Sequence, residues 1–203
     1  MTVLDLEPDQ LLSTTRAVRK RLDFDRPVPD DLIRECVRLA LQAPSGSNTV
    51  TMRFVVVRDP ELKTAIAGYY KQSYDKYRAQ QQPRDEQGRR VASSADYLSE
   101  HMAEAPALVI GCNKGFDRKS AQVGMGNILP AMWSFMLAAR ARALGTSWTT
   151  LHLPYEREVA DLLGIPYETV AQAVLTPVAF TKGTDFKPAT RPEPDKVIHW
   201  DRW

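Results

Sequence analysis

The chain has 203 residues, of which 43% are hydrophobic and 26% are charged. This composition is typical of a globular domain with a real core, and it excludes a disordered or fibrous chain. The formal net charge of +2 is too small to favour nucleic acid or an anionic membrane as a partner. Cys36 and Cys112 have no paired spacing, so we expect buried free thiols in the reducing cytoplasm.

The sequence carries no signal for export, membrane insertion or metal binding. The N-terminus lacks a basic stretch followed by an apolar core, so no signal peptide is predicted. The most apolar region, residues 128–144, contains Arg140 and Arg142 and is too short to span a bilayer. The three histidines are scattered, and no HExxH, GxSxG or phosphate-loop motif occurs. If the protein is an enzyme, a bound organic cofactor therefore carries the reaction.

In the first half of the chain, apolar periodicity predicts helices and a short β-rich run predicts a strand. Pro44 forbids continuation of the second helix. The strand is continuously apolar at 54–57 and is therefore expected to be buried on both faces. Polar residues at about 83–90 predict a mobile surface loop. The predicted elements are helices at 8–15, 30–42, 59–82 and 91–104, and a strand at 53–57.

A long helix dominates the second half of the chain. Its apolar residues cover most of its circumference, which predicts burial in a subunit interface. Gly145 is expected to cap this helix, and Pro177 to mark an edge or a bend in the last strand. The aromatic-rich tail is expected to dock on its own subunit or on a partner. The predicted elements are strands at 107–112 and 170–180, helices at 121–144 and 154–163, and an extended segment at 146–151.

Three separated stretches are candidates for a binding site. The basic run 16–21 suits an anion such as phosphate, although a solvated charge cluster has the same composition. The loop 43–48, Ala-Pro-Ser-Gly-Ser-Asn, lets a flat ligand approach the backbone, although an ordinary helix-to-strand connector also fits it. The third stretch is 145–150. In addition, Tyr70, Tyr74 and Tyr77 share one helix face that could lie near a flat cofactor, although packing alone also explains it.

Together these stretches resemble the FMN-dependent nitroreductase family over nearly the full chain. The run 16–20 looks like that family's N-terminal Arg-Ser-x-Arg phosphate and flavin motif, with Ala17 in place of the usual Ser. The loop 43–48 followed by the strand looks like its flavin-ring loop and first strand. Residues 143–148 resemble the segment beside the flavin, and Arg191 matches the tail residue that holds the phosphate.

The resemblance implies an α+β sandwich, with a mostly antiparallel sheet flanked by helices, as a single domain over residues 1–203. It implies a homodimer with FMN at the subunit interface. A C-terminal dimerisation arm, residues 182–203, would be exchanged onto the partner subunit. The apolar long helix and the aromatic tail agree with a dimer independently of the resemblance.

The same resemblance implies a cytoplasmic oxidoreductase with tightly bound FMN. NAD(P)H would give a hydride to the flavin, and a nitroaromatic, quinone or similar electron-poor acceptor would then take the same place. No catalytic side chain is named, because solvent can supply the proton. Pro44, Ser45, Ser47 and Asn48 would come from the partner subunit. The implied cofactor-binding residues are Arg16, Ala17, Val18, Arg19, Pro44, Ser45, Gly46, Ser47, Asn48, Thr149, Thr150, Leu151, Lys187 and Arg191.

Two other readings of the sequence remain open. A flavin-binding protein without reductase activity would keep the FMN contacts but cover the ring face, for instance with the tyrosine helix. A small basic adaptor would use the run 16–21 on an acidic partner or nucleic acid and would bind no flavin.

Overall fold

The computed structural model describes residues 3–81, 85–115 and 121–203. Within these residues a five-stranded sheet forms the centre of the protein, and every pair of its strands is antiparallel. The central strand β5 pairs with β3 and, near its C-terminal end, with β1 along one edge, and with β4 along the other, while β2 is the edge strand beyond β3. This confirms the predicted α+β class. The strands are β1 (Leu22–Asp23), β2 (Met52–Val57), β3 (Ala107–Lys114), β4 (Leu144–Thr146) and β5 (Val170–Thr181).

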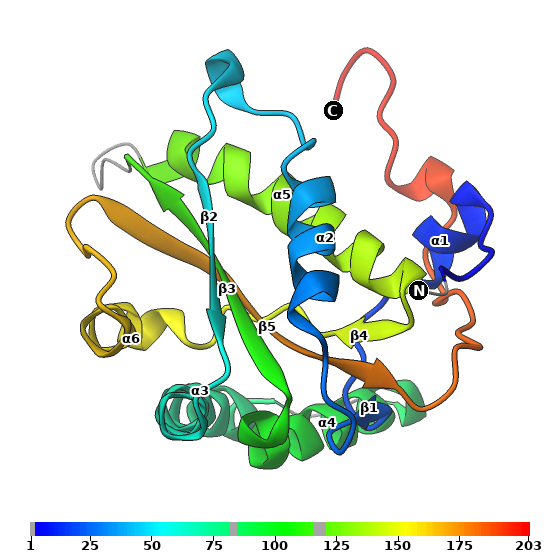
Figure 1. The fold of residues 1–203 in the computed structure, drawn as a ribbon. Helices are drawn as coiled ribbons and strands as arrows, with labels where there is room; N and C mark the ends of the chain where they lie inside the picture. The colour runs from blue at the N-terminus through cyan, green and yellow to red at the C-terminus, as the bar shows by residue number, and fades with distance from the viewer. Residues whose placement is uncertain (1–2, 82–84, 116–120) are drawn as a thin grey trace.

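Helices cover both faces of the sheet (Figure 1). The helices α2 and α5 pack on one face, and α3, α4 and α6 pack on the other. The α-helices are α1 (Pro8–Thr14), α2 (Asp30–Ala40), α3 (Pro60–Ala79), α4 (Glu86–His101), α5 (Ala121–Ala141) and α6 (Glu156–Leu163). The 3-10 turns are η1 (Gly46–Asn48), η2 (Met102–Glu104), η4 (Leu153–Tyr155) and η5 (Pro194–Lys196).

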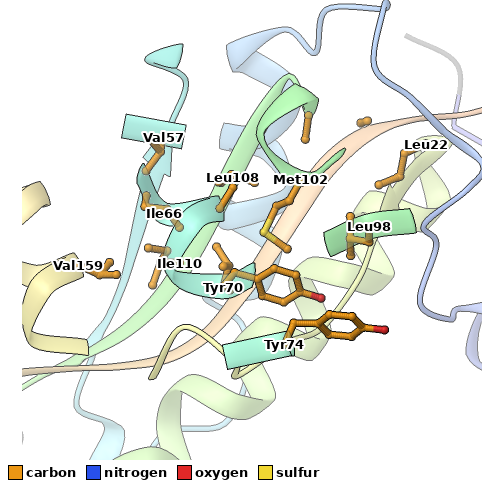
Figure 2. Close-up of a cluster of buried hydrophobic side chains, with 14 of the residues drawn as sticks. Leu22, Val57, Ile66, Tyr70, Tyr74, Leu98, Met102, Leu108, Ile110 and Val159 are labelled. Atoms are coloured by element: carbon orange, nitrogen blue, oxygen red, sulfur yellow. The ribbon is translucent and has the colours of Figure 1, made fainter. Parts of the chain in front are cut away.

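The alternation of side chains along β3 divides the core between the two faces. Val109 packs in the cluster with Phe135 of α5, whereas Leu108 and Ile110 pack under α3 with Ile66 (Figure 2). Each fully buried side chain of this size contributes roughly 2 kcal/mol to folding. A Cβ at Gly111 would lie 2.5 Å from Met132 Cγ, so a glycine is needed for α5 to approach β3 this closely.

Gly145 does not cap the long helix, contrary to the sequence prediction. The helix α5 ends at Ala141, and Ala143 takes the left-handed conformation with φ 59°. Gly145 lies instead in the middle of β4, where a Cβ would approach Leu22 Cδ2 and Thr181 Cγ2 to 2.8 Å. The space beside this strand therefore requires a glycine, for a packing reason that the sequence pattern does not show.

The strand predictions need two corrections. Because β2 is an edge strand, it is not buried on both faces, and Val56 is 40% exposed. Conversely, β5 is an interior strand despite Pro177. On the β4 side, this proline lies between the pairs Thr146↔Val178 and Thr149↔Leu175. Between these pairs the Ser147 amide donates to a side chain, Thr176 Oγ1 (2.9 Å), rather than to the backbone of β5. Pro177 therefore marks a local break in one ladder of an interior strand.

The predicted loop at about 83–90 is shorter than expected. Residues 82–84 lie outside the described residues, and α4 already begins at Glu86. The carboxylate of Asp85 caps this helix by accepting a hydrogen bond from the Gly88 amide (2.6 Å). The first turn of α4 thus brings residues 86–90 into the folded structure.

Two further observations concern the chain as a whole. Among the described helices, none combines the length and the apolar character needed to cross a membrane. Both cysteines are buried free thiols, as predicted. Burial raises the pKa of the Cys36 thiol to about 11 and that of Cys112 to about 12, so neither is a ready nucleophile.

Candidate functional site

The fold brings together the basic run 16–21, the segment that follows β4 and the start of the tail at one end of the sheet. Ala17 forms a parallel bridge with Thr146, and the Val18 amide donates to the Thr146 carbonyl at 2.8 Å. This contact places the basic run beside β4 and the chain that follows it. The Lys182 amide donates to the Arg21 carbonyl at 2.8 Å, which anchors the start of the tail at the same place.

A basic pocket of about 520 Å³ lies where these segments meet. Its charged side chains are Arg16, Arg19, Arg90 and Lys187, and no carboxylate lines it. Arg16 Nη1 donates to the Lys187 carbonyl at 2.9 Å, which joins the basic run to the tail. Four cations with no carboxylate among the described lining residues make this pocket chemically suited to an anion such as phosphate.

Arg90 was missed by the sequence analysis. It falls in the stretch predicted as a mobile loop, where no periodic pattern marks a helix. The Asp85 cap provides the signal that was present in the sequence, because Asp before a run of helix formers is a common N-cap.

A larger cavity, of about 750 Å³, adjoins the basic pocket and shares Arg19, Gln87 and Val91 with it. Residues 147–151 form one wall, and the face of α3 that carries Tyr70, Tyr74 and Tyr77 forms another. The first turns of α4 close a third side. This volume lies within the usual range of about 300–1,000 Å³ for sites that bind organic ligands.

Backbone hydrogen bonds hold the wall formed by residues 147–151. Thr149 and Leu175 exchange two bonds of 3.0 and 2.9 Å, and the Leu151 amide donates to Thr149 Oγ1 at 3.2 Å. Burial raises the pKa of Tyr70 to about 12, while its hydrogen bond to Thr149 acts in the opposite direction. The predicted residues Thr149, Thr150 and Leu151 therefore line the cavity on a rigid segment.

A hydrogen-bonded triad joins α3 to α4 at the cavity. Tyr74 Oη donates to Asp96 Oδ1 at 2.6 Å, and Arg78 Nε donates to the same oxygen at 2.9 Å. The bond from Tyr74 is the largest cause that holds the pKa of Asp96 below its ordinary value. Burial, followed by the bond to Asp96, raises the pKa of Tyr74. The tyrosine face is thus fixed by polar contacts as well as by packing.

The loop 43–48 lies at the opposite end of the protomer, around η1, away from α3 and α4 (Figure 1). Its Gly46 amide donates to Asn127 Oδ1 at 2.7 Å, and Asn127 Nδ2 in turn donates to Thr51 Oγ1 at 2.9 Å. Ser47 and Asn48 both have left-handed backbones, with φ of 53° and 54°. Strained, exposed backbone held by a polar network is typical of a functional loop. Within one protomer this loop does not line the cavity.

The two tail residues differ in their positions. Lys187 lines the basic pocket. Arg191 is exposed and does not line it, and within the described part of the chain its guanidinium donates one long hydrogen bond, 3.5 Å, to the Thr190 carbonyl. Of the predicted phosphate ligands, Arg16 and Lys187 line the same pocket, together with Arg19, which was expected near the flavin ring; the role of Arg191 stays a prediction.

His152 directly follows the cavity wall and is fully buried. Within the described residues, neither ring nitrogen has a hydrogen-bond partner. Burial lowers the pKa of this imidazole from 6.5 to about 4. The folded protein therefore holds the ring neutral at pH values where the unfolded chain protonates it.

We expect His152 to make stability pH-dependent. Between pH 6.5 and 4 the unfolded state binds the extra proton, so stability falls as the pH falls, by up to roughly 3 kcal/mol over the whole window. Urea unfolding at pH 7, 6, 5 and 4.5 measures this. In His152→Gln the fall should be shallower than in the parent. Equal slopes in the two proteins would contradict the assignment.

Comparisons with known proteins identify the family of this chain. The sequence model of the Nitroreductase family matches residues 12–178. A putative NADH dehydrogenase/NAD(P)H nitroreductase of Archaeoglobus fulgidus is 25% identical over 199 residues, covering 96% of this chain and 97% of the relative. An iodotyrosine deiodinase of Thermotoga neapolitana is 27% identical over 177 residues, covering 83% of this chain and 86% of the relative.

A solved structure has the same fold. The crystal structure of oxidised iodotyrosine deiodinase bound to FMN and 3-iodo-L-tyrosine superposes with a TM-score of 0.72 at 22% identity, covering 95% of this chain and 98% of that one. The family match spans most of the chain, from before the basic run to β5. The chain belongs to the nitroreductase family of flavoprotein oxidoreductases.

Proposed function

We propose that the protein is an FMN-dependent oxidoreductase that uses NAD(P)H to reduce electron-poor acceptors such as nitroaromatics and quinones. The observation that carries the proposal is the basic pocket, free of carboxylates, that opens into the large cavity. A ligand with a phosphate at one end and a broad organic ring system at the other matches this pair of spaces. FMN has that shape, and when bound it supplies hydride transfer.

The residues of the pocket suit the phosphate. Arg16 and Lys187 contact each other through the Lys187 carbonyl, so both cations are held at the same site. A phosphate monoester carries close to two negative charges at neutral pH and accepts several charge-assisted hydrogen bonds. Arg19 lines both spaces, and in this position its guanidinium would stabilise negative charge at the ring end of the ligand.

The walls of the cavity would orient the ring system. Residues 147–151 present a hydrogen-bonded segment on one side, and Trp148 and the tyrosines add aromatic surface. The loop 43–48 would reach the ring from the partner subunit, since it is too distant within its own protomer. Ser45, Ser47 and Asn48 then supply hydroxyl and amide groups for the polar ring edge.

The flavin-binding protein without reductase activity remains an alternative. It requires that the tyrosine face, which lines the same cavity of about 750 Å³, cover the bound ring and leave no room for a second molecule. The two deiodinase relatives, one by sequence and one by structure, add halogenated phenols to the classes of acceptor worth testing.

The absorption spectrum of the purified protein tests the function directly. We expect a flavin spectrum that bleaches on anaerobic addition of NADPH or NADH and returns when a quinone, a nitroaromatic or 3-iodotyrosine is added. Protein without added nicotinamide serves as the control. A flavin spectrum that persists with both nicotinamides would support the non-catalytic alternative, and failure to bind added FMN would overturn the proposal.

Substitution of one pocket cation tests the phosphate assignment. Arg16→Gln removes a charge-assisted contact worth about 1.5–3 kcal/mol, so the dissociation constant of FMN should rise by at least tenfold. Fluorescence titration of apoprotein measures it, with Arg157→Gln, at an exposed cation on α6, as the matched control. An unchanged affinity would place the phosphate elsewhere. Arg191→Ala in the same titration tests whether the tail arginine takes part.

We also propose that the tail is an arm that docks on a second copy of the chain. Residues 191–203 are exposed throughout, and Trp200 and Trp203 are 80% and 101% exposed. A groove of about 570 Å³ between α2 and the edge strand β2 offers an apolar surface for such residues. Its floor includes Val37, Phe54 and Val56.

The backbone of β2 favours this docking, because its outer edge leaves backbone groups available to an added strand. The groove carries Arg34, Arg38 and Arg58 together with Asp30, and residues 191–203 carry three cations and three carboxylates, so the contact rests on apolar surface and backbone bonding. The arm of one protomer would therefore complete the sheet edge of the other.

Deletion of residues 192–203 tests the arm. We expect the full chain to sediment as a dimer in analytical ultracentrifugation and the deleted chain to dissociate at least tenfold more readily. Circular dichroism of the deleted chain should stay that of a folded protein, because the arm contributes no buried residue to its own protomer. An equally stable dimer after deletion would show that the interface lies elsewhere.

A further inference from the structure

A second basic surface lies on α4, next to the phosphate pocket. It is a groove of about 510 Å³ lined by Lys20, Glu86, Arg89, Arg90 and Ser93. Lys20 Nζ donates to Ser93 Oγ at 2.8 Å, which ties the basic run to this helix. Within the described ranges, no ion pair involves Lys20, Arg89 or Arg90.

The groove and the cavity occupy neighbouring faces of one helix. Residues 88, 91, 92 and 95 of α4 line the cavity, while 86, 89, 90 and 93 line the groove. Arg90 belongs to both the groove and the phosphate pocket. Because a helix with its side chains is only about 10–12 Å across, a long ligand that leaves the cavity over α4 reaches the groove directly.

The charge of the groove suits a second phosphate group. Its three cations and one carboxylate leave a net charge of +2, which matches a doubly charged phosphate monoester. The Glu86 carboxylate is an acceptor, so it disfavours an anion beside it but suits a sugar hydroxyl next to the phosphate. A phosphorylated ribose presents both groups together.

We propose that Lys20, Arg89 and Arg90 bind the 2′-phosphate of NADPH, the group that NADH lacks. The nicotinamide end of the same molecule would lie in the cavity, and its adenosine end would cross α4 to the groove. This inference rests on the proposed function and adds to it a preference for NADPH. The FMN phosphate is better served by the neighbouring pocket, where no carboxylate competes with it.

Arg89→Gln is the sharpest variant, because Arg89 lines the groove but neither the phosphate pocket nor the cavity. Steady-state kinetics with one acceptor should show a KM for NADPH raised about tenfold, as expected for one lost charge-assisted contact, and a KM for NADH changed less than twofold. Arg89→Lys should recover most of the loss, and Arg157→Gln should change neither value. An equal rise for both nicotinamides, or no rise for NADPH, would overturn the proposal.

A binding measurement separates this inference from the proposed function. Adenosine 2′,5′-bisphosphate and 5′-AMP differ only in the 2′-phosphate, and calorimetry of the FMN-loaded protein needs no turnover. The bisphosphate should bind at least tenfold more tightly to the parent, and Arg89→Gln should abolish most of that difference. Equal affinity of the two nucleotides for the parent would overturn the inference even if the protein is a reductase. A clear difference would support it even if no hydride is transferred.

Discussion

The site depends on the hydrogen bonding of both edges of β5. This strand is buried over nearly its whole length, so its backbone groups must find partners within the protein. β3 and β1 satisfy one edge, and the other is satisfied by β4 and the bridge at Thr149. Those short partners have little stability of their own. Their pairing with β5 fixes the positions of the basic run and of the cavity wall.

A second constraint follows from the cations that this pairing assembles. Arg16, Arg19, Arg90 and Lys187 repel one another when no anion lies between them. Their guanidinium and ammonium groups stay near solvent, which reduces that cost, and the backbone bond of Val18 to Thr146 holds the run in place. An anion that enters the pocket removes the repulsion, so ligand binding and folding stability support each other here.

Much of the fold was predictable because the periodic signals are strong. The regular spacing in α2, the proline start of α3 and the apolar runs of β3 and β5 each follow a local rule. Gly145 misled the prediction, because a glycine is required there by close packing against Leu22 and Thr181, which are distant in sequence. The exposed side of β2 was likewise set by its place at the sheet edge.

The candidate site was likewise only partly predictable from the sequence. Arg16 and Arg19 lie in a basic run that local composition marks, whereas the segment 149–151 was named from the family resemblance. Arg90 joins them only through the tertiary position of α4, so no local pattern identified it. The loop 43–48 has left-handed backbone at Ser47 and Asn48, which its composition did not predict, and it does not line the cavity of its own protomer.

The proline content of the tail bears on how many copies can assemble. If the arm of one protomer docks on a neighbour, that neighbour can dock its own arm back on the first protomer, which gives a closed dimer. It can instead dock its arm on a third copy, which starts an open filament. Pro188, Pro192 and Pro194 fix φ at three points between β5 and the aromatic end. A linker stiffened in this way presents the arm in few directions. If the arm docks on a second copy as proposed, such a linker would favour reciprocal exchange over chain growth and would cover the exposed tryptophans within a pair.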